Sequence, residues 1–230
     1  MTGLSEGPRV LKHPLYSRLF HWSLILGFLP AALTGFILYI KPGGEDLVNL
    51  AMKVHIVGAA ILTIGCLLYA VLCLDRVVGF IRRNFTWDNR DFRWLLVGGG
   101  YPQKMFLGKK IPVPPMGKVN PGQKIFGLCL LFFGPVLILT GWILYAFIPV
   151  VPKAYINVVS HFHLILGLFM GLFLGAHIFL GVYNWGEFKA MFGDGTQPLT
   201  ECEDHNPVWV QKDIEPVAAA GREHSTSRGV

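Results

Sequence analysis

The chain has 230 residues, of which 53% are hydrophobic and only 15% are charged. Soluble domains carry about a quarter charged residues, so the composition argues against a soluble protein and for a membrane protein. The net charge of +6 then reflects basic residues flanking membrane segments rather than a nucleic-acid surface. The four cysteines contain no Cys-x-x-Cys pair, which argues against a zinc or iron–sulfur site within the chain.

Four long uncharged runs predict four membrane-spanning helices. About 20 apolar residues cross the hydrocarbon core as a helix, and each run is at least that long. The spans are expected at about 19–40, 54–74, 125–148 and 156–186. Pro30 and Pro135 lie inside the first and third spans and predict kinks there. The predicted fold is an all-α integral membrane protein, a four-helix bundle forming a single membrane domain over residues 1–230.

The distribution of basic residues predicts the orientation. Residues 75–124 hold ten Lys and Arg against three acidic residues, so this connection is expected to be a cytoplasmic loop. Both termini are expected on the same side, including a cytoplasmic C-terminal tail at 187–230, and the two short connections face outward. The last residues, 216–230, have the composition of a disordered tail.

Five of the eight histidines lie in or at the edge of the predicted spans, where an imidazole is costly and is usually functional. They are His21, His55, His161, His163 and His177. Judged from the nearest charged residues, His21 and His177 lie in the cytoplasmic half of the membrane, and His55 and His163 in the outer half. Each half thus holds one histidine from span four and one from an earlier span, which indicates two metal centres stacked across the bilayer.

Helical phase separates the three histidines of span four. His163 and His177 are 14 residues apart, which leaves the second about 40° short of four full turns and roughly 21 Å along the axis. They therefore share a face. His161 is rotated by about 160° from His177, so we predict that it is not a ligand and instead lines the outer end of the bundle.

The ligand type favours haem. Two axial imidazoles hold a haem in a six-coordinate form suited to electron transfer, whereas zinc would need further carboxylate or thiolate ligands. Gly167, Gly171 and Gly175 form a ridge beside the histidine face, which suits either a flat macrocycle or close helix packing. The alternative is a haem-free anchor or small transporter with histidines as packing or proton-relay residues. The absence of acidic residues from all four runs argues against the transporter.

Several short motifs carry a resemblance to a known family. They are RLFHW, ALTG, KVHIVG, VNPGQK, ILTGW, HLILG, GAHIFLG and NPVW. Over about residues 16–210 the chain resembles the cytochrome b (gamma) subunit of membrane-bound respiratory formate dehydrogenases, within the wider di-haem cytochrome b family that includes the membrane subunits of hydrogenases and thiosulfate reductases. The 14-residue spacing of the span-four histidines, with a glycine four residues after the first, is the most specific element.

The resemblance implies two b haems. His21 and His177 would ligate the iron of the cytoplasmic-side haem, and His55 and His163 that of the outer one, in agreement with the depth pairing. It also implies that a quinone, menaquinone or ubiquinone, binds in the loop before span three, near the cytoplasmic haem. The quinone-binding residues would be Asn120, Gly122 and Gln123. The same Asn-Pro-Gly-Gln stretch also has the pattern of a helix start, and both interpretations remain open.

The function implied is that of an electron-transfer subunit in the bacterial cytoplasmic (inner) membrane. An extracytoplasmic iron–sulfur subunit, attached to a catalytic dehydrogenase subunit, would deliver electrons through the two haems to the quinone pool. Two departures from the formate dehydrogenase pattern, Ile56 where proline is frequent and the additional His161, leave the partner open. The alternative is the cytochrome b subunit of a membrane-bound hydrogenase or a related oxidoreductase.

Overall fold

The computed structural model describes residues 7–216 of the chain. Within them, four helices are long and apolar enough to cross a membrane, which confirms the predicted helical membrane fold. They are α1 (Leu15–Ile40), α2 (Glu45–Leu72), α6 (Pro121–Phe147) and α7 (Lys153–Tyr183). The cytoplasmic location of the termini stays a prediction. The disorder predicted for 216–230 falls, apart from Pro216, outside the described residues.

The chain divides into two compact units. The first comprises His13–Ile81 and Phe126–Gly195 and holds the long helices; the second comprises residues 7–12, Arg82–Ile125 and 196–216. The shorter elements are β1 (Arg9–Leu11), α3 (Leu74–Phe85), α4 (Asn89–Leu96), a 3₁₀ turn (Gly98–Gly100), α5 (Tyr101–Leu107), α8 (Trp185–Phe192), β2 (Thr196–Pro198), α9 (Leu199–His205), α10 (Pro207–Trp209) and a π-helical turn (Val210–Ile214). The segment predicted as a cytoplasmic loop, 75–124, therefore has helices of its own.

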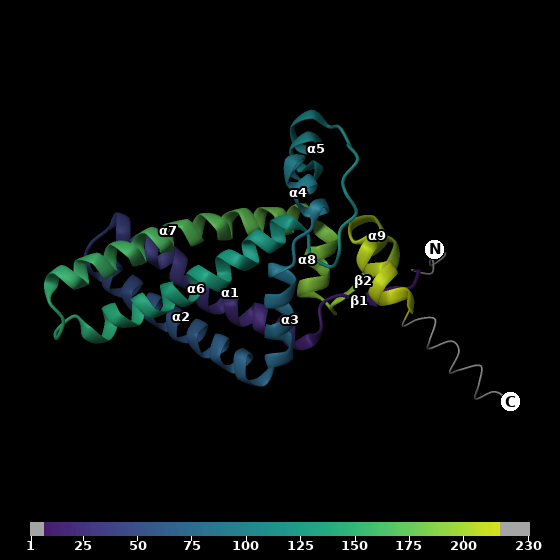
Figure 1. Ribbon diagram of the computed structural model, residues 1–230. Coiled ribbons are helices and arrows are strands. Elements are labelled where there is room, and N and C mark those ends of the chain that lie inside the picture. Colours follow the sequence, from purple (N-terminus) through teal and green to yellow (C-terminus); the bar gives the residue numbers. More distant parts are fainter. Residues whose placement is uncertain (1–6, 217–230) are drawn as a thin grey trace, which may run out of the picture. The chain divides into compact units, whose positions relative to one another are not determined.

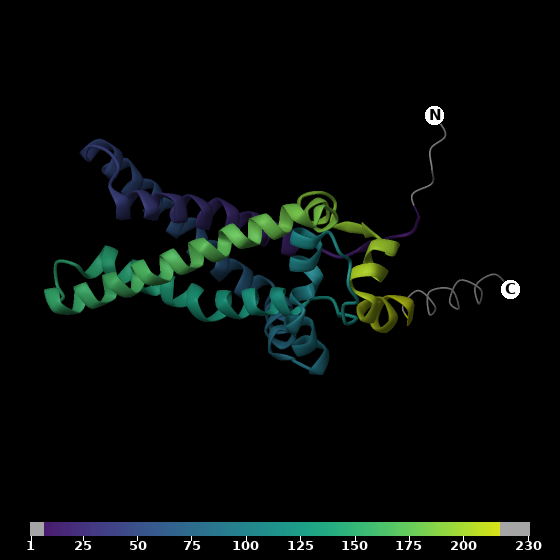
Figure 2. The same cartoon turned by 90° about the horizontal axis from the view of Figure 1, so that it is seen from above.

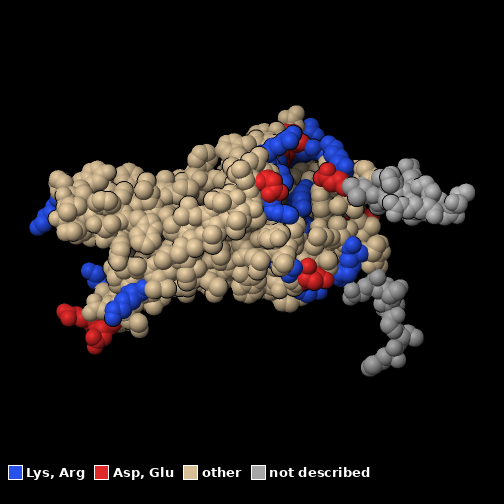
Figure 3. Space-filling model, turned by 90° about the horizontal axis from the view of Figure 1, so that it is seen from below, with Lys and Arg blue, Asp and Glu red and all other residues tan. Residues whose placement is uncertain are grey.

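The four long helices run side by side in the first unit, and the two short connections that join them lie at the same end (Figures 1 and 2). Along the middle of these helices, the face in Figure 3 shows neither basic nor acidic side chains. Large apolar side chains point outward from the helices: Leu67, Leu139 and Leu172 are 62%, 61% and 74% exposed. Such a surface is unfavourable in water and is suited to lipid.

Glycines bring α1 and α2 into close backbone contact. A Cβ atom on Gly27 would lie 2.6 Å from the backbone nitrogen of Leu62, and one on Gly58 would lie 2.7 Å from the carbonyl oxygen of Gly27. On Gly65, a Cβ would lie 2.6 Å from the hydroxyl of Ser23. Small residues at membrane helix interfaces permit this approach, and only glycine fits at these three positions.

In the second unit, a buried ion pair joins the first turn of α6 to α4. The ammonium of Lys124 lies 2.7 and 2.8 Å from the two carboxylate oxygens of Asp91 and donates to the carbonyl oxygen of Thr86 at 2.8 Å. Lys124 and Asp91 are only 8% and 4% exposed. Removing either partner would leave an uncompensated buried charge. The pair therefore holds α4 against the first turn of α6.

A small polar core holds the ends of the described chain together in the same unit. Strands β1 and β2 pair antiparallel. Next to them the buried ammonium of Lys12 donates to the side-chain oxygen of Asn206 at 2.6 Å, and the Asn206 amide donates to the carbonyl oxygen of Gly117 at 2.6 Å. The Asn-Pro-Val-Trp motif therefore has a structural role here: its asparagine links the N-terminal strand to the segment before α6.

The close α1–α2 contact makes a testable prediction. Replacing Gly27 with alanine should destabilise the protein by about 1–3 kcal/mol, because the new methyl group meets backbone that cannot move aside. The matched control is Gly181→Ala in α7, where a Cβ meets nothing within 4 Å. Thermal unfolding of the two variants in the same detergent measures the effect; equal melting temperatures would contradict the packing described.

Candidate metal centres

The structure brings the intramembrane histidines together in two pairs. The ring centroids of His21, on α1, and His177, on α7, lie 6.2 Å apart. Those of His55, on α2, and His163, on α7, lie 6.1 Å apart. These are the pairs predicted from depth and helical phase; ligation of a metal by them stays a prediction. Each pair combines one histidine from the α1–α2 hairpin with one from α7.

The spacing of each pair suits two ligands on opposite sides of one metal ion. With metal–nitrogen bonds of about 2.0–2.1 Å, the two ring centroids lie about 6 Å apart. Among residues 7–216, no group of three or more His, Cys, Asp or Glu side chains lies close enough to hold a metal. Two imidazoles are too few for a zinc site but fill both axial positions of a haem, so the donor set fits haem.

Hydrogen bonds fix the tautomer of the outer pair. Nδ1 of His55 lies 2.8 Å from the carbonyl oxygen of Ala31, which can only accept, so Nδ1 carries the proton. Nδ1 of His163 lies 3.0 Å from the hydroxyl oxygen of Thr140, which donates its own proton to the carbonyl oxygen of Val136 and therefore accepts from Nδ1. In both rings Nε2 keeps its lone pair, which is the atom that a metal requires.

The inner pair is held differently, by ring packing. The ring of His177 stacks on Phe126 with centroids 4.5 Å apart and planes 13° from parallel. The ring of His21 meets Phe192 edge-on at 5.7 Å. Nδ1 of His21 is buried without a hydrogen-bond partner, and His177 makes no hydrogen bond within the described part of the chain. The outer histidines are therefore positioned by hydrogen bonds at Nδ1, and the inner histidines by contacts with aromatic rings.

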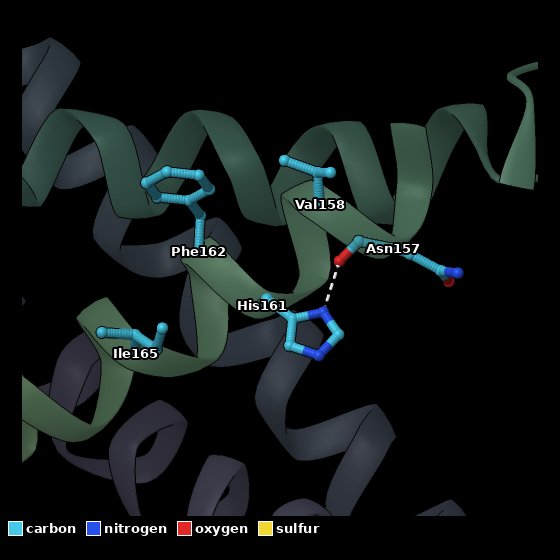
Figure 4. A pocket seen from close by; sticks show the side chains of 5 residues that line it. All are labelled: Asn157, Val158, His161, Phe162 and Ile165. Atoms are coloured by element: carbon cyan, nitrogen blue, oxygen red, sulfur yellow. Dashed lines mark hydrogen bonds between the residues drawn. The ribbon is translucent and has the colours of Figure 1, made fainter. Parts of the chain in front are cut away.

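A cavity of about 490 Å³ opens beside the outer pair. His55 and His163 line it together with Gly35, and Lys41 and His161 also border it. His161 is exposed and bonds through Nδ1 to the carbonyl oxygen of Asn157 at 2.7 Å (Figure 4). His161 belongs to neither ring pair, in line with its predicted rotation away from His177. It lies at the rim of the outer cavity.

The glycine ridge of α7 is open. A Cβ on Gly171 or Gly175 would meet nothing within 4 Å, and one on Gly167 would reach only the Leu137 side chain at 4.0 Å. Of the two interpretations offered by the sequence, close helix packing is not what these glycines provide among the described residues. Contact between this ridge and a flat ligand stays a prediction.

Asn120 and Gln123 form a reciprocal cap at the start of α6. The backbone N–H of Gln123 donates to the side-chain oxygen of Asn120, and that of Asn120 donates to the side-chain oxygen of Gln123, each at 2.9 Å. This is a capping box. A Cβ on Gly122 would press on the Asn120 oxygen and on the Trp94 ring, each at 3.3 Å. The helix-start interpretation of this motif is confirmed, and the quinone role stays a prediction.

Sequence reasoning did not assign roles to Thr34, Gly35, Thr140 and Gly141, which contact the outer histidines. The signal was present in the sequence, because both pairs occur as Leu-Thr-Gly, once in span one and once in span three. What the sequence does not show is which side of each helix faces the histidines.

Four apolar helices with paired imidazoles at two levels define a membrane-embedded protein of the cytochrome b class. Residues 12–194 match the model of the prokaryotic cytochrome b561 family, and the chain belongs to that family, whose cofactor is haem b. The chain is also 22% identical over 211 residues to the cytochrome b556(Fdn) subunit of the nitrate-inducible formate dehydrogenase of Escherichia coli K12, an alignment covering 91% of this chain and 94% of the relative. The corresponding subunits of Escherichia coli O157:H7 and Shigella flexneri match equally well. The resemblance inferred from the motifs is confirmed.

The two histidines of the His-Phe-His triplet should behave differently on substitution. His163→Ala should remove one haem per chain, because it deletes half of the outer ring pair, whereas His161→Ala should leave the haem content unchanged. Haem extraction with protein quantification measures both variants against the unaltered chain. Loss of haem in His161→Ala with retention in His163→Ala would show that the pairing is wrong.

Proposed function

We propose that this chain is the di-haem b membrane subunit of a respiratory dehydrogenase. The observation that carries the proposal is the presence of two imidazole pairs, with centroids 6.2 and 6.1 Å apart, each joining the α1–α2 hairpin to α7. His21 and His177 hold one haem, and His55 and His163 hold the other. Haem, when bound, supplies reversible one-electron transfer. The four histidines would supply the nitrogens that hold the two irons.

The partner proposed is a formate dehydrogenase, through an extracytoplasmic iron–sulfur subunit attached to the catalytic subunit. Its support is the similarity to the Escherichia coli cytochrome b556(Fdn) subunit over 91% of this chain. With haem bound, His55 and His163 would hold the centre that receives electrons, and His21 and His177 would hold the centre that donates them to the quinone pool. The protein lies in the bacterial inner membrane with both termini in the cytoplasm, as the ten basic residues of segment 75–124 require under the positive-inside rule.

Quinone binding is assigned to Asn120 and Gln123, with Gly122 keeping the turn between them narrow. The capping box uses the side-chain oxygen of each amide, so the cap leaves both NH₂ groups as donors, and neither group has a partner among the described residues. A quinone presents two carbonyl acceptors. The cap leaves donors that match a ligand of that chemistry, so the structural and functional roles of the motif are compatible.

Haem content tests the central proposal. The purified chain should show a reduced-minus-oxidised spectrum of b-type haem, with two haems per chain by extraction. His21→Ala and His55→Ala should each leave one haem, and the double variant none. A colourless preparation, or haem retained in the double variant, would overturn the assignment.

The quinone site can be tested without disturbing the cap. Asn120→Asp and Gln123→Glu keep the oxygens that accept from the backbone and remove the NH₂ donors. Acidic residues are also favoured at a helix start. Each variant should keep both haems and reduce kcat/KM for a soluble quinone analogue by about 2- to 10-fold, the value of one hydrogen bond of about 0.5–1.5 kcal/mol.

The matched control is Gln211→Glu, which adds the same charge at an exposed position of the C-terminal segment. It should leave quinone reduction unchanged. Unaltered kinetics in both cap variants would remove Asn120 and Gln123 from the quinone site. The partner is identified by affinity purification of the intact complex: haem reduction on adding formate supports the assignment, and reduction by hydrogen instead would indicate a hydrogenase.

A further inference from the structure

We propose that Thr34-Gly35 on α1 and Thr140-Gly141 on α6 are two matching supports that orient the outer histidines and stabilise the oxidised form of the outer centre. The threonines and the carbonyl of Ala31 contact Nδ1, and the glycines contact each ring next to it, at Cε1. The proposal rests on the proposed function in one respect: a b haem must lie between His55 and His163.

The threonine hydroxyls are positioned as acceptors. The hydroxyl of Thr140 lies 2.7 Å from the carbonyl oxygen of Val136 and that of Thr34 lies 2.6 Å from the carbonyl oxygen of Pro30. A hydroxyl has a single proton, and these carbonyls can only accept. Each threonine therefore presents a lone pair to the imidazole, at 3.0 Å from Nδ1 of His163 and 3.4 Å from Nδ1 of His55.

A backbone carbonyl accompanies each threonine at the same position of its helix. The carbonyl oxygens of Ala31 and Leu137, each three residues before a threonine, lie 3.3 and 3.1 Å from the hydroxyls of Thr34 and Thr140. The Ala31 carbonyl also accepts from Nδ1 of His55 at 2.8 Å. The carbonyl is therefore the close acceptor for His55, and the hydroxyl of Thr140 is the close acceptor for His163.

The glycine after each threonine contacts the Cε1 side of the same ring. A Cβ on Gly141 would lie 3.0 Å from Cε1 of His163, and one on Gly35 would lie 3.2 Å from Cε1 of His55. Both distances are tighter than ordinary carbon–carbon contact. Each ring therefore rests against a helix at a position where no larger residue fits, and rotation about its Cβ–Cγ bond is restricted.

Such threonine bonds also occur without any histidine, and this supplies an internal comparison. Serine and threonine in membrane helices commonly donate to the carbonyl four residues earlier. The hydroxyl of Thr63 does so to Ala59 at 2.7 Å, and it accepts from the indole of Trp142 at 3.0 Å. The outer supports differ from Thr63 in accepting from an imidazole N–H.

The difference between the two pairs gives the supports a redox role. A hydrogen bond from Nδ1–H raises the basicity of the other ring nitrogen, which favours the more positively charged ferric iron and lowers the reduction potential. Both outer histidines have such bonds, whereas His21 has none at Nδ1. The outer centre should therefore have the lower potential, so that electrons pass from the outer to the inner centre in the downhill direction.

Redox titration of the purified holoprotein, with each haem followed at its own absorbance maximum, tests the proposal. Thr140→Val should raise the outer potential so that the oxidised-to-reduced ratio at a fixed potential falls about three- to tenfold, where tenfold corresponds to 59 mV for a one-electron couple. Thr34→Val should act in the same direction but less, because its contact is longer. Thr140→Ser should restore the unaltered value. The inner potential should not change in any variant.

Two controls separate this effect from a general loss of packing. Thr63→Val removes an equivalent intramembrane hydroxyl and should leave both potentials unchanged. Gly141→Ala should lower outer haem occupancy or change the low-spin electron paramagnetic resonance signal of that haem, whereas Gly134→Ala, whose nearest neighbour is at 3.8 Å, should not. Equal potentials in Thr140→Val and the unaltered chain, with two haems present in both, would overturn the supports while leaving the proposed function standing. An unaltered chain without haem would overturn the proposed function itself.

Discussion

A polar atom inside a bilayer has no water to bond with, and the arrangement of this protein follows from that constraint. A neutral imidazole carries one N–H donor and one lone pair, and both need partners in hydrocarbon. In the outer pair, helix carbonyls and threonine hydroxyls take the donors of His55 and His163. Both rings border one cavity, and the lone pair left on each ring needs a metal or a hydrogen-bond donor as its partner in hydrocarbon.

The donor of His55 reaches its acceptor only because α1 and α2 approach so closely. Its Nδ1 belongs to α2 and the carbonyl of Ala31 belongs to α1. Gly27 and Gly58, where the two backbones meet, lie within one turn of Ala31 and of His55 respectively. The glycine contact between α1 and α2 and the orientation of His55 are therefore parts of one arrangement. Loss of the helix contact would also remove the acceptor that fixes the tautomer of His55.

The sequence predicted the parts of this structure that depend on residue type and spacing along one helix. Four uncharged runs gave the four long helices, and the 14-residue interval with the depth of each histidine gave the two ring pairs. Contacts between helices depend on the rotation of each helix about its axis, which no local pattern records. For this reason Thr140 and Gly141 were noted only as part of the ILTGW motif, and no role in the site was predicted for them.

Lys124 shows the same limit for charge. Counting basic residues placed it among the signals of a cytoplasmic loop, but the structure buries it against Asp91, 33 positions earlier in the chain. The cap at Asn120 and Gln123 was visible in the sequence because a capping box is local. The position of His161 at the rim of the cavity was only partly predictable: helical phase excluded it from the ring pairs but did not show that it borders the same space as His163.

The division of each ring pair between hairpins has a consequence for biogenesis. His21 and His55 belong to the α1–α2 hairpin, and His163 and His177 belong to α7, the last of the four long helices among the described residues. Neither site exists in a nascent chain until α7 has left the ribosome and packed against its neighbours. With these histidines as the haem ligands, as proposed, haem would be held at both sites only after α7 has packed against the α1–α2 hairpin.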